Sequence, residues 1–323
     1  MAREEENKDM IERGVIEAES ERSEMAVRQA ASPRSARLGQ RRMALMLLVI
    51  LLICFGKPLY DLARFSIHGD LYSHIVLIPF ITVYLIWLKR QKLAQLPAVA
   101  SPWAIIPLAA GAAVLGGYWL ARYSGWKPGT AEYLAMMTLS FLLFLLSGCV
   151  GLLGAKGLRA IAFPLAFLVF MVPFPHAVER WVESFLQHGS AEAAYGLFNL
   201  TGMPVFRNET GFQLPGFAME IAPQCSGIHS SLVLFITSLL AGYLLLQFRW
   251  TKAVLLLLIV PLGILRNAFR ICLLGHLCVR VNPDWINSDL HRRGGPLFFV
   301  ASLVPFFLLL LVLRKLERRR NDE

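Results

Sequence analysis

The feature that most constrains this chain is a series of apolar runs, each long enough to cross a lipid bilayer. A transmembrane helix needs about 20 consecutive, mostly apolar residues. The runs that approach this length lie near residues 43–60, 71–88, 103–120, 133–153, 158–174, 228–247, 252–270 and 296–313. The sequence therefore predicts an all-α membrane protein, a bundle of about eight transmembrane helices.

Composition excludes the main soluble classes. Of the 323 residues, 56% are hydrophobic and 17% are charged, whereas a soluble chain is about one-quarter charged. Lipid covers the apolar outside that water cannot. The formal charge of +10 lies in short clusters between the apolar runs rather than on a soluble domain or stripe. Membrane lipid is therefore the expected surrounding, and no nucleic-acid partner is expected.

The positions of the basic clusters predict the orientation. With eight helices, all five clusters fall on one side of the membrane, which is then the cytoplasmic side. The clusters are Arg41 and Arg42; Lys89, Arg90 and Lys92; Lys156 and Arg159; Arg249 and Lys252; and the group from Arg314 to Arg320. This pattern predicts a multi-pass protein of a bacterial inner (plasma) membrane, with both termini in the cytoplasm.

The chain divides into three predicted parts. Residues 1–42 hold nine basic and nine acidic residues and few large apolar ones, so they are expected to form a largely disordered cytoplasmic tail. Residues 43–315 form the transmembrane domain, and residues 316–323 a basic cytoplasmic end.

One long loop, residues 175–227, is predicted on the outer side. Its first part, 177–200, has helical periodicity and is expected to lie on the membrane surface. Its second part, 205–222, carries Gly211, Pro215 and Gly216 between short apolar stretches, which predicts a small extracytoplasmic β-hairpin.

Cys225 lies where this loop becomes the sixth helix. Pro223 disfavours regular helix upstream, so Cys225 is expected at or near the helix N-terminus. Unpaired N–H groups and the helix dipole there favour a thiolate, which is a nucleophile. A buried, inert cysteine would explain the position equally well.

A cluster of polar residues lies at the outer end of the seventh helix. Asn267 and Arg270 are three residues apart and share a helix face, as do Arg266 and Arg270. An arginine at the rim of a membrane helix is costly unless it is paired or hydrated, so it is a functional candidate. The alternative is an arginine that snorkels to the lipid headgroups.

His291 precedes the eighth helix and is followed by Gly294 and Gly295. Histidine is the usual general base near neutral pH, although an outer-loop histidine with no task is the simpler interpretation of this motif alone. The predicted topology brings Cys225, Arg270 and His291 to the same outer face. A thiol, a fixed cation and a base together suit acyl transfer.

Other histidines and cysteines are weaker candidates. His74 lies at the outer start of the second helix and is a candidate to line the site, and His229 is expected one turn below Cys225 on the same helix face. Hydrogen-bonded bundle histidines are the alternative for both. Cys272 and His276 share a helix face, but Cys278 points away from it. No metal and no cofactor are therefore expected.

The motifs resemble those of the exosortase/archaeosortase family, which are multi-pass membrane cysteine transpeptidases. Cys225-Ser226-Gly227-Ile228 resembles the family's nucleophile motif, and Asn267-Ala268-Phe269-Arg270 matches its asparagine-x-x-arginine motif. His291 resembles the third active residue. The likeness spans about residues 57–313. Ile228 and His229 stand where the family often has leucine and arginine, which leaves the subfamily open.

The resemblance implies roles for these residues. Cys225 would be the nucleophile, Arg270 the group that stabilises the oxyanion or a substrate carboxylate, and His291 the general acid and base. The supporting residues would be Asn267, Arg266, His74, Ser226, Gly227 and His229.

The resemblance also implies the substrates. They would be secreted proteins with a C-terminal tail made of a short motif (Pro-Glu-Pro in the best-known class), a transmembrane helix and a basic cluster. The enzyme would cut the tail at the outer face through a thioester. It would then pass the new C-terminus to a cell-surface or exopolysaccharide-linked acceptor.

Two other functions remain open at this level. A multi-pass transporter would use Arg266 and Arg270 to bind an anionic substrate, although the chain lacks the paired, broken helices typical of repeat-built transporters. A non-catalytic assembly factor for polysaccharide export would need neither Cys225 nor His291.

Overall fold

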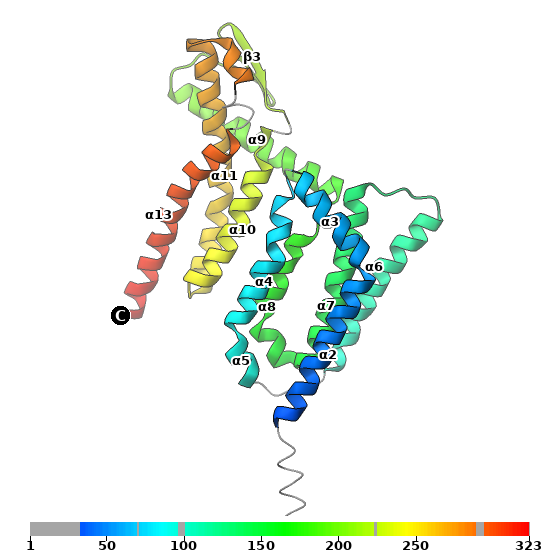
Figure 1. Cartoon of the computed structure of the whole chain (residues 1–323). Helices are drawn as coiled ribbons and strands as arrows, with labels where there is room; N and C mark the ends of the chain where they lie inside the picture. The colour runs from blue at the N-terminus through cyan, green and yellow to red at the C-terminus, as the bar shows by residue number, and fades with distance from the viewer. Residues whose placement is uncertain (1–32, 70, 96–100, 223–224, 289–293, 323) are drawn as a thin grey trace, which may run out of the picture. The chain divides into compact units, whose positions relative to one another are not determined.

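The computed structural model describes residues 33–69, 71–95, 101–222, 225–288 and 294–322. Most of them are helical (Figure 1). The α-helices are α2 (Pro33–Cys54), α3 (Gly56–His68), α4 (Leu77–Leu88), α5 (Arg90–Gln95), α6 (Ile105–Tyr123), α7 (Thr130–Ala160), α8 (Ala162–Phe167), α9 (His176–Leu200), α10 (Ile228–Leu245), α11 (Arg249–Arg280) and α13 (Gly295–Asp322). Short 3₁₀ helices are η1 (Ser73–Val76), η2 (Pro102–Ala104), η3 (Leu168–Met171) and η5 (Pro283–Asn287). The strands are β1 (Phe206–Asn208), β2 (Gly211–Leu214) and β3 (Phe217–Glu220).

The helices confirm a multi-pass membrane protein but not the predicted count of eight spans. Five described helices are long and apolar enough to cross a membrane: Pro102–Tyr123, Thr130–Ala160, Ile228–Leu245, Arg249–Arg280 and Gly295–Arg320. The count rises to seven if two sharply bent pairs each form one span, namely Arg42–Cys54 with Gly56–His68 and Ala162–Met171 with His176–Leu200. The remaining predicted run corresponds to Ser73–Leu88, a shorter apolar helix.

Prolines explain why the fifth run is not a single straight span. Its helix ends at Met171, and Pro173 and Pro175 follow before α9 begins at His176. Proline removes a backbone donor and restricts the residue before it, so it favours the end of a helix. The first described helix, α2, begins at Pro33, within the segment that the sequence assigns to the tail. Residues 1–32 lie outside the described part of the chain.

The described chain forms two compact units. The first consists of the described residues of 1–60, 81–126 and 136–169, and the second of those of 61–80, 127–135 and 170–323. In the first unit, α6 packs closely on α7 at Gly111, where an added Cβ would lie 3.1 Å from the Phe144 ring. The Ser140 hydroxyl donates to the Gly111 carbonyl oxygen over 2.9 Å. Small and polar residues therefore permit close helix approach here, as is common in membranes.

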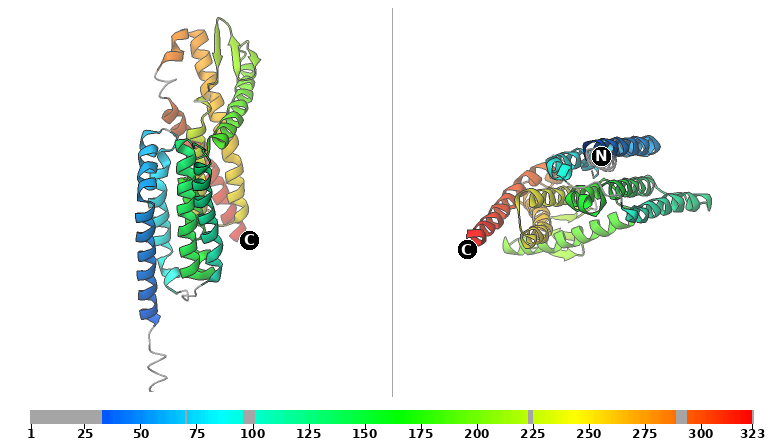
Figure 2. Two further views of the ribbon diagram at one scale, coloured as in Figure 1. Left: turned by 90° about the vertical axis from the view of Figure 1, so that its right-hand side faces the viewer. Right: turned by 90° about the horizontal axis from the view of Figure 1, so that it is seen from below.

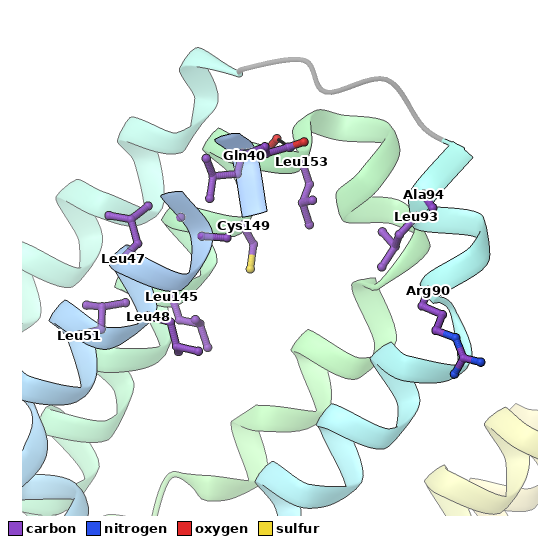
Figure 3. Close-up of a pocket in the computed structure, with 13 residues that line it drawn as sticks. Gln40, Leu47, Leu48, Leu51, Arg90, Leu93, Ala94, Leu145, Cys149 and Leu153 are labelled. Carbon is purple, nitrogen blue, oxygen red and sulfur yellow. Dashed lines mark hydrogen bonds between the residues drawn. The ribbon is translucent and has the colours of Figure 1, made fainter. Parts of the chain in front are cut away.

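The first unit also contains an apolar cavity of about 310 Å³ between α2, α5 and α7 (Figure 3). Leucines make up much of its wall, together with Gln40 and Cys149, and the Arg90 guanidinium points away from its centre. That guanidinium stacks on the Trp87 ring at 3.9 Å from the ring centroid. None of the residues predicted for chemistry lines this cavity.

The second unit contains the loop of residues 175–227, as far as it is described, and the last three long helices. Figure 1 shows α10, α11 and α13 side by side, with the strands next to the C-terminal part of α11. The long helix predicted for 177–200 is confirmed as α9, and the seventh predicted helix continues to Arg280. The hairpin predicted within 205–222 is confirmed and gains a third strand, so that the sheet is an antiparallel meander in the order β1-β2-β3.

A core of buried side chains joins α9, the sheet and α11. The left view of Figure 2 shows the ribbons of these three elements close together. Phe198 of α9 is fully buried against Phe212 of β2, with the ring centroids 5.5 Å apart. Gly275 of α11 faces Phe198 so closely that an added Cβ would lie 2.7 Å from the ring. This core fixes the C-terminal part of α11 against the sheet, and Cys225 packs at its edge.

At the other end of the second unit, the Glu317 carboxylate of α13 caps the start of α11. It accepts hydrogen bonds from the backbone N–H groups of Gln247 at 2.9 Å and Phe248 at 2.9 Å, and from the Thr251 hydroxyl. Glu317 is 3% exposed. A carboxylate at a helix N-terminus satisfies donors that have no partner within the helix and also interacts favourably with the helix dipole.

Replacing Glu317 by alanine is therefore expected to lower the free energy of unfolding by about 2 kcal/mol, because two part-buried amides lose their acceptor. Glu317→Gln should cost less, since its side-chain carbonyl still accepts. Thermal unfolding of the detergent-solubilised protein measures the effect, with the exposed Arg318→Ala as the control on the same helix turn. Equal stability of Glu317→Ala and Arg318→Ala would contradict the cap.

Candidate functional site

The segment between the sheet and α10 places the Cys225 thiol. Beyond β3, the Cys225 N–H donates to the Ala222 carbonyl oxygen over 2.8 Å. Gly227 then adopts a left-handed conformation with φ of 77°, which glycine reaches without strain. The helix begins at Ile228. Cys225 thus precedes the helix N-terminus closely, as the sequence predicts, but it does not belong to the helix.

Asn267 of α11 holds this segment by hydrogen bonds to the segment's main-chain carbonyl groups. Its Nδ2 donates to the carbonyl oxygens of Cys225 at 3.0 Å and Ser226 at 3.2 Å, and lies 3.1 Å from the Ser190 hydroxyl of α9. Asn267 is 3% exposed and Ser190 is fully buried. One buried amide therefore joins α9, α11 and the segment that carries the thiol.

Arg266 supports the same segment from the next position on α11. Its Nη2 donates to the Gly227 carbonyl oxygen over 3.3 Å and to the Ser231 hydroxyl over 3.4 Å. An added Cβ on Gly227 would lie 3.1 Å from that nitrogen and 3.2 Å from Asn267 Cγ. Any residue larger than glycine at 227 would therefore press on both side chains that hold the segment.

Cys225, Asn267 and Arg270 line one cavity of about 310 Å³. Arg270 follows Asn267 by three residues on α11, so the two side chains share a helix face. The rest of the cavity wall consists of Phe217, Ala218, Met219, Glu220, Ile221, Ala222, Ile271, Leu274 and Ile286. The cavity thus combines one thiol and one guanidinium with a mainly apolar wall and the whole of β3.

The other predicted residues have different positions. His291 lies outside the described residues. Ser226 is 1% exposed, and its hydroxyl accepts from the Ile228 N–H at 3.4 Å, so it supports the turn. The helix face predicted to join Cys225 and His229 does not form, because the left-handed Gly227 separates them. His229 lies instead 3.3 Å from the Ser73 hydroxyl.

His74 is also buried away from the lining of this cavity. It is 9% exposed, and its Nδ1 has no hydrogen-bond partner within the described part of the chain. Neither His74 nor His229 is among the residues that line the cavity beside Cys225. The two histidines and Ser73 instead form a polar group between η1 and the start of α10.

Sequence reasoning missed Ser190 and the wall formed by β3. Ser190 lies in a stretch of small residues, Gly189-Ser190-Ala191, whose size was the available signal for a close helix contact. An added Cβ on Gly189 would lie 3.0 Å from Ile264 of α11. Close approach of α9 and α11 at this point is what allows Ser190 to reach Asn267.

Comparison with known families gives a match over most of the chain. A family model described as "Transmembrane exosortase (Exosortase_EpsH)" matches residues 66–308. This range contains Cys225, Asn267, Arg270 and His291. Searches of curated proteins and of solved structures gave no match.

Proposed function

The chain belongs to the transmembrane exosortase family, and from this premise we propose that it is a membrane cysteine transpeptidase that cuts the C-terminal sorting tails of secreted proteins. Membership supports a sorting role at the membrane in general. The proposal that Cys225 cuts sorting tails rests on the cavity that this residue shares with Asn267 and Arg270. In this arrangement a nucleophile and a fixed cation face the same space.

The proposed reaction begins with the Cys225 thiolate. Its sulfur attacks the carbonyl carbon of the scissile peptide bond, and the carbonyl oxygen takes the negative charge. The Arg270 guanidinium stabilises that oxyanion. The carbon–nitrogen bond then breaks, and His291 gives a proton to the leaving amine, so that the secreted protein remains on Cys225 as a thioester. Ile286, five residues before His291, lines the same cavity.

The second half of the reaction releases the protein. A nucleophile on the acceptor attacks the thioester carbonyl, His291 takes its proton, and the thiolate is restored. The proposed acceptor is a cell-surface or exopolysaccharide-linked group. Asn267 and Arg266 keep the Cys225 segment in place throughout, because both hold its carbonyl oxygens.

The proposed location of the cavity is the outer face of the plasma membrane. The basic clusters at Arg249 and Lys252 and at Arg314 to Arg320 support cytoplasmic ends for α10, α11 and α13. Cys225 precedes the start of α10, and Arg270 lies in the C-terminal part of α11. Both positions are therefore at the helix ends that lie away from these basic clusters. A substrate with a transmembrane tail would then present its cleavage site at the level of the cavity.

Thiol labelling in intact cells tests the proposal. In a variant whose only cysteine is Cys225, with Cys54, Cys149, Cys272 and Cys278 replaced by alanine, a membrane-impermeant maleimide is expected to label the chain. The rate at which secreted proteins are cut should fall in proportion to the fraction of chains that carry the label. The same treatment of a chain that lacks all five cysteines controls for off-target effects. Full labelling with continued cleavage would contradict a catalytic thiol and favour a transporter or an assembly factor.

A further inference from the structure

Strand β3 is an open edge of the sheet. Among the described residues it pairs with β2 alone. The Ile221 N–H, just beyond β3, donates to the Thr210 carbonyl oxygen over 3.1 Å. Backbone groups of successive strand residues point to opposite sides. Phe217, Met219 and Ile221 therefore face β2, whereas Ala218 and Glu220 turn their N–H and C=O groups to the open side.

The open edge belongs to the wall of the Cys225 cavity. All four residues of β3 line the cavity, and Cys225 follows Glu220 by five residues. The Ala218 and Glu220 side chains are exposed. Within the described part of the chain, the peptide groups of these two residues have no hydrogen-bond partner. An extended chain placed along β3 would thus run past the thiol.

Unpaired strand edges are templates for another strand, and proteins usually blunt them with charges, prolines or covering segments. Here the edge carries one charged residue, Glu220, and one small residue, Ala218, which leaves room for a neighbouring chain. Peptides that add a strand to a sheet gain affinity from main-chain hydrogen bonds and specificity from pockets for alternate side chains. Ile271, Leu274 and Ile286 provide an apolar wall for such side chains.

We propose that the open edge of β3 binds the substrate segment next to the scissile bond as a fourth strand of the sheet. The inference rests on the proposed function, because the occupant is the peptide that Cys225 attacks. Main-chain bonds to Ala218 and Glu220 set the register of the peptide and so determine which carbonyl lies beside the thiol. Alternate side chains of the bound segment contact the apolar wall.

Disulfide cross-linking tests the register. Ala218→Cys and Glu220→Cys are made separately in a chain whose five native cysteines, Cys225 included, are replaced by alanine. The probe is a secreted protein that accumulates uncut in the Cys225→Ala strain, with single cysteines at successive positions around its cut site. We expect cross-links at alternate probe positions. The cross-linked positions should shift by two residues when the enzyme cysteine is moved from 218 to 220. The control is Phe206→Cys, which lies in the same cross-strand row as Ala218 but on the opposite edge.

Each outcome decides the question. Cross-linking without alternation, or equally strong cross-linking to Phe206→Cys, would overturn strand addition while leaving cysteine catalysis intact. Cross-links between two copies through residue 218 would show that the edge pairs with a second chain instead. The absence of any uncut protein in the Cys225→Ala strain would overturn the proposed function, and the inference with it.

A proline at the edge provides a second test. Ala218→Pro removes the outward N–H and places a ring in the path of the added strand, while the bonds to β2 come from other residues. Cleavage is expected to slow by about tenfold, the equivalent of one or two main-chain hydrogen bonds. Ala218→Val keeps the N–H and adds only side-chain bulk, so it should slow cleavage less than Ala218→Pro does. Equal cleavage by the two variants at equal membrane levels would overturn the inference. If the proline variant does not accumulate, the cross-linking result decides.

Discussion

Replacing Cys225 by alanine is expected to reduce cleavage of sorting tails by at least about 1,000-fold, with the protein still folded and inserted. Among the described residues that line the cavity, Cys225 carries the sole thiol. The fold should survive because Asn267 and Arg266 hold carbonyl oxygens of this segment, which alanine retains. The lost sulfur therefore removes the nucleophile without releasing the segment.

The measurement is the ratio of cut to uncut secreted protein over time, together with the amount of the variant in the membrane fraction. Cys54→Ala is the matched control, because Cys54 is an exposed thiol on α2 that does not line the cavity. Cys225→Ser should also be strongly impaired, since an unactivated hydroxyl is a weak nucleophile. Normal cleavage by a well-inserted Cys225→Ala chain would exclude cysteine catalysis.

Substitution of Arg270 by glutamine is expected to slow cleavage by about 100- to 1,000-fold, the usual effect of removing a group that stabilises an oxyanion. Arg270→Lys keeps the charge but loses the planar donor fork, so it should recover part of the rate. Arg280→Gln, an exposed arginine at the end of the same helix, is the control. Neither Arg270→Gln nor Arg270→Lys changes Asn267 or the groups that it binds.

Single-turnover kinetics separate the two possible roles of Arg270. An oxyanion role predicts slower formation of the thioester with little change in substrate association. A role in binding a substrate carboxylate predicts weaker association, with the chemical step preserved at saturation. Unchanged rates in Arg270→Gln would remove this residue from the proposed mechanism.

Much of the site follows from local sequence patterns. The spacing of Asn267 and Arg270 places them on one helix face whatever the rest of the fold does. Pro223 and Gly227 mark the segment before α10, so the position of Cys225 near a helix start was predictable. Turn residues such as Pro215 and Gly216 likewise predicted the strands, because they impose turn geometry locally.

The remaining features depend on contacts between distant segments. Hydropathy is the same on both sides of a bend, so the apolar run that contains Cys54, Phe55 and Gly56 gave no sign that two helices meet there. The contact of Ser190 with Asn267 joins residues 77 positions apart. The prediction that Cys225 and His229 share a helix face was wrong, because the left-handed Gly227 lies between them and the helix begins only at Ile228. The role of His291 stays a prediction.

The cap on α11 has a consequence for how the chain is made. The amides of Gln247 and Phe248 leave the ribosome 70 and 69 residues before Glu317, the group that satisfies them. Until the last turns of α13 are synthesised, the α10–α11 connection has exposed donors and an incomplete helix start. Nascent chains that stop short of Glu317 should therefore be recognised as unfinished and degraded, and a fusion tag is best attached beyond this residue.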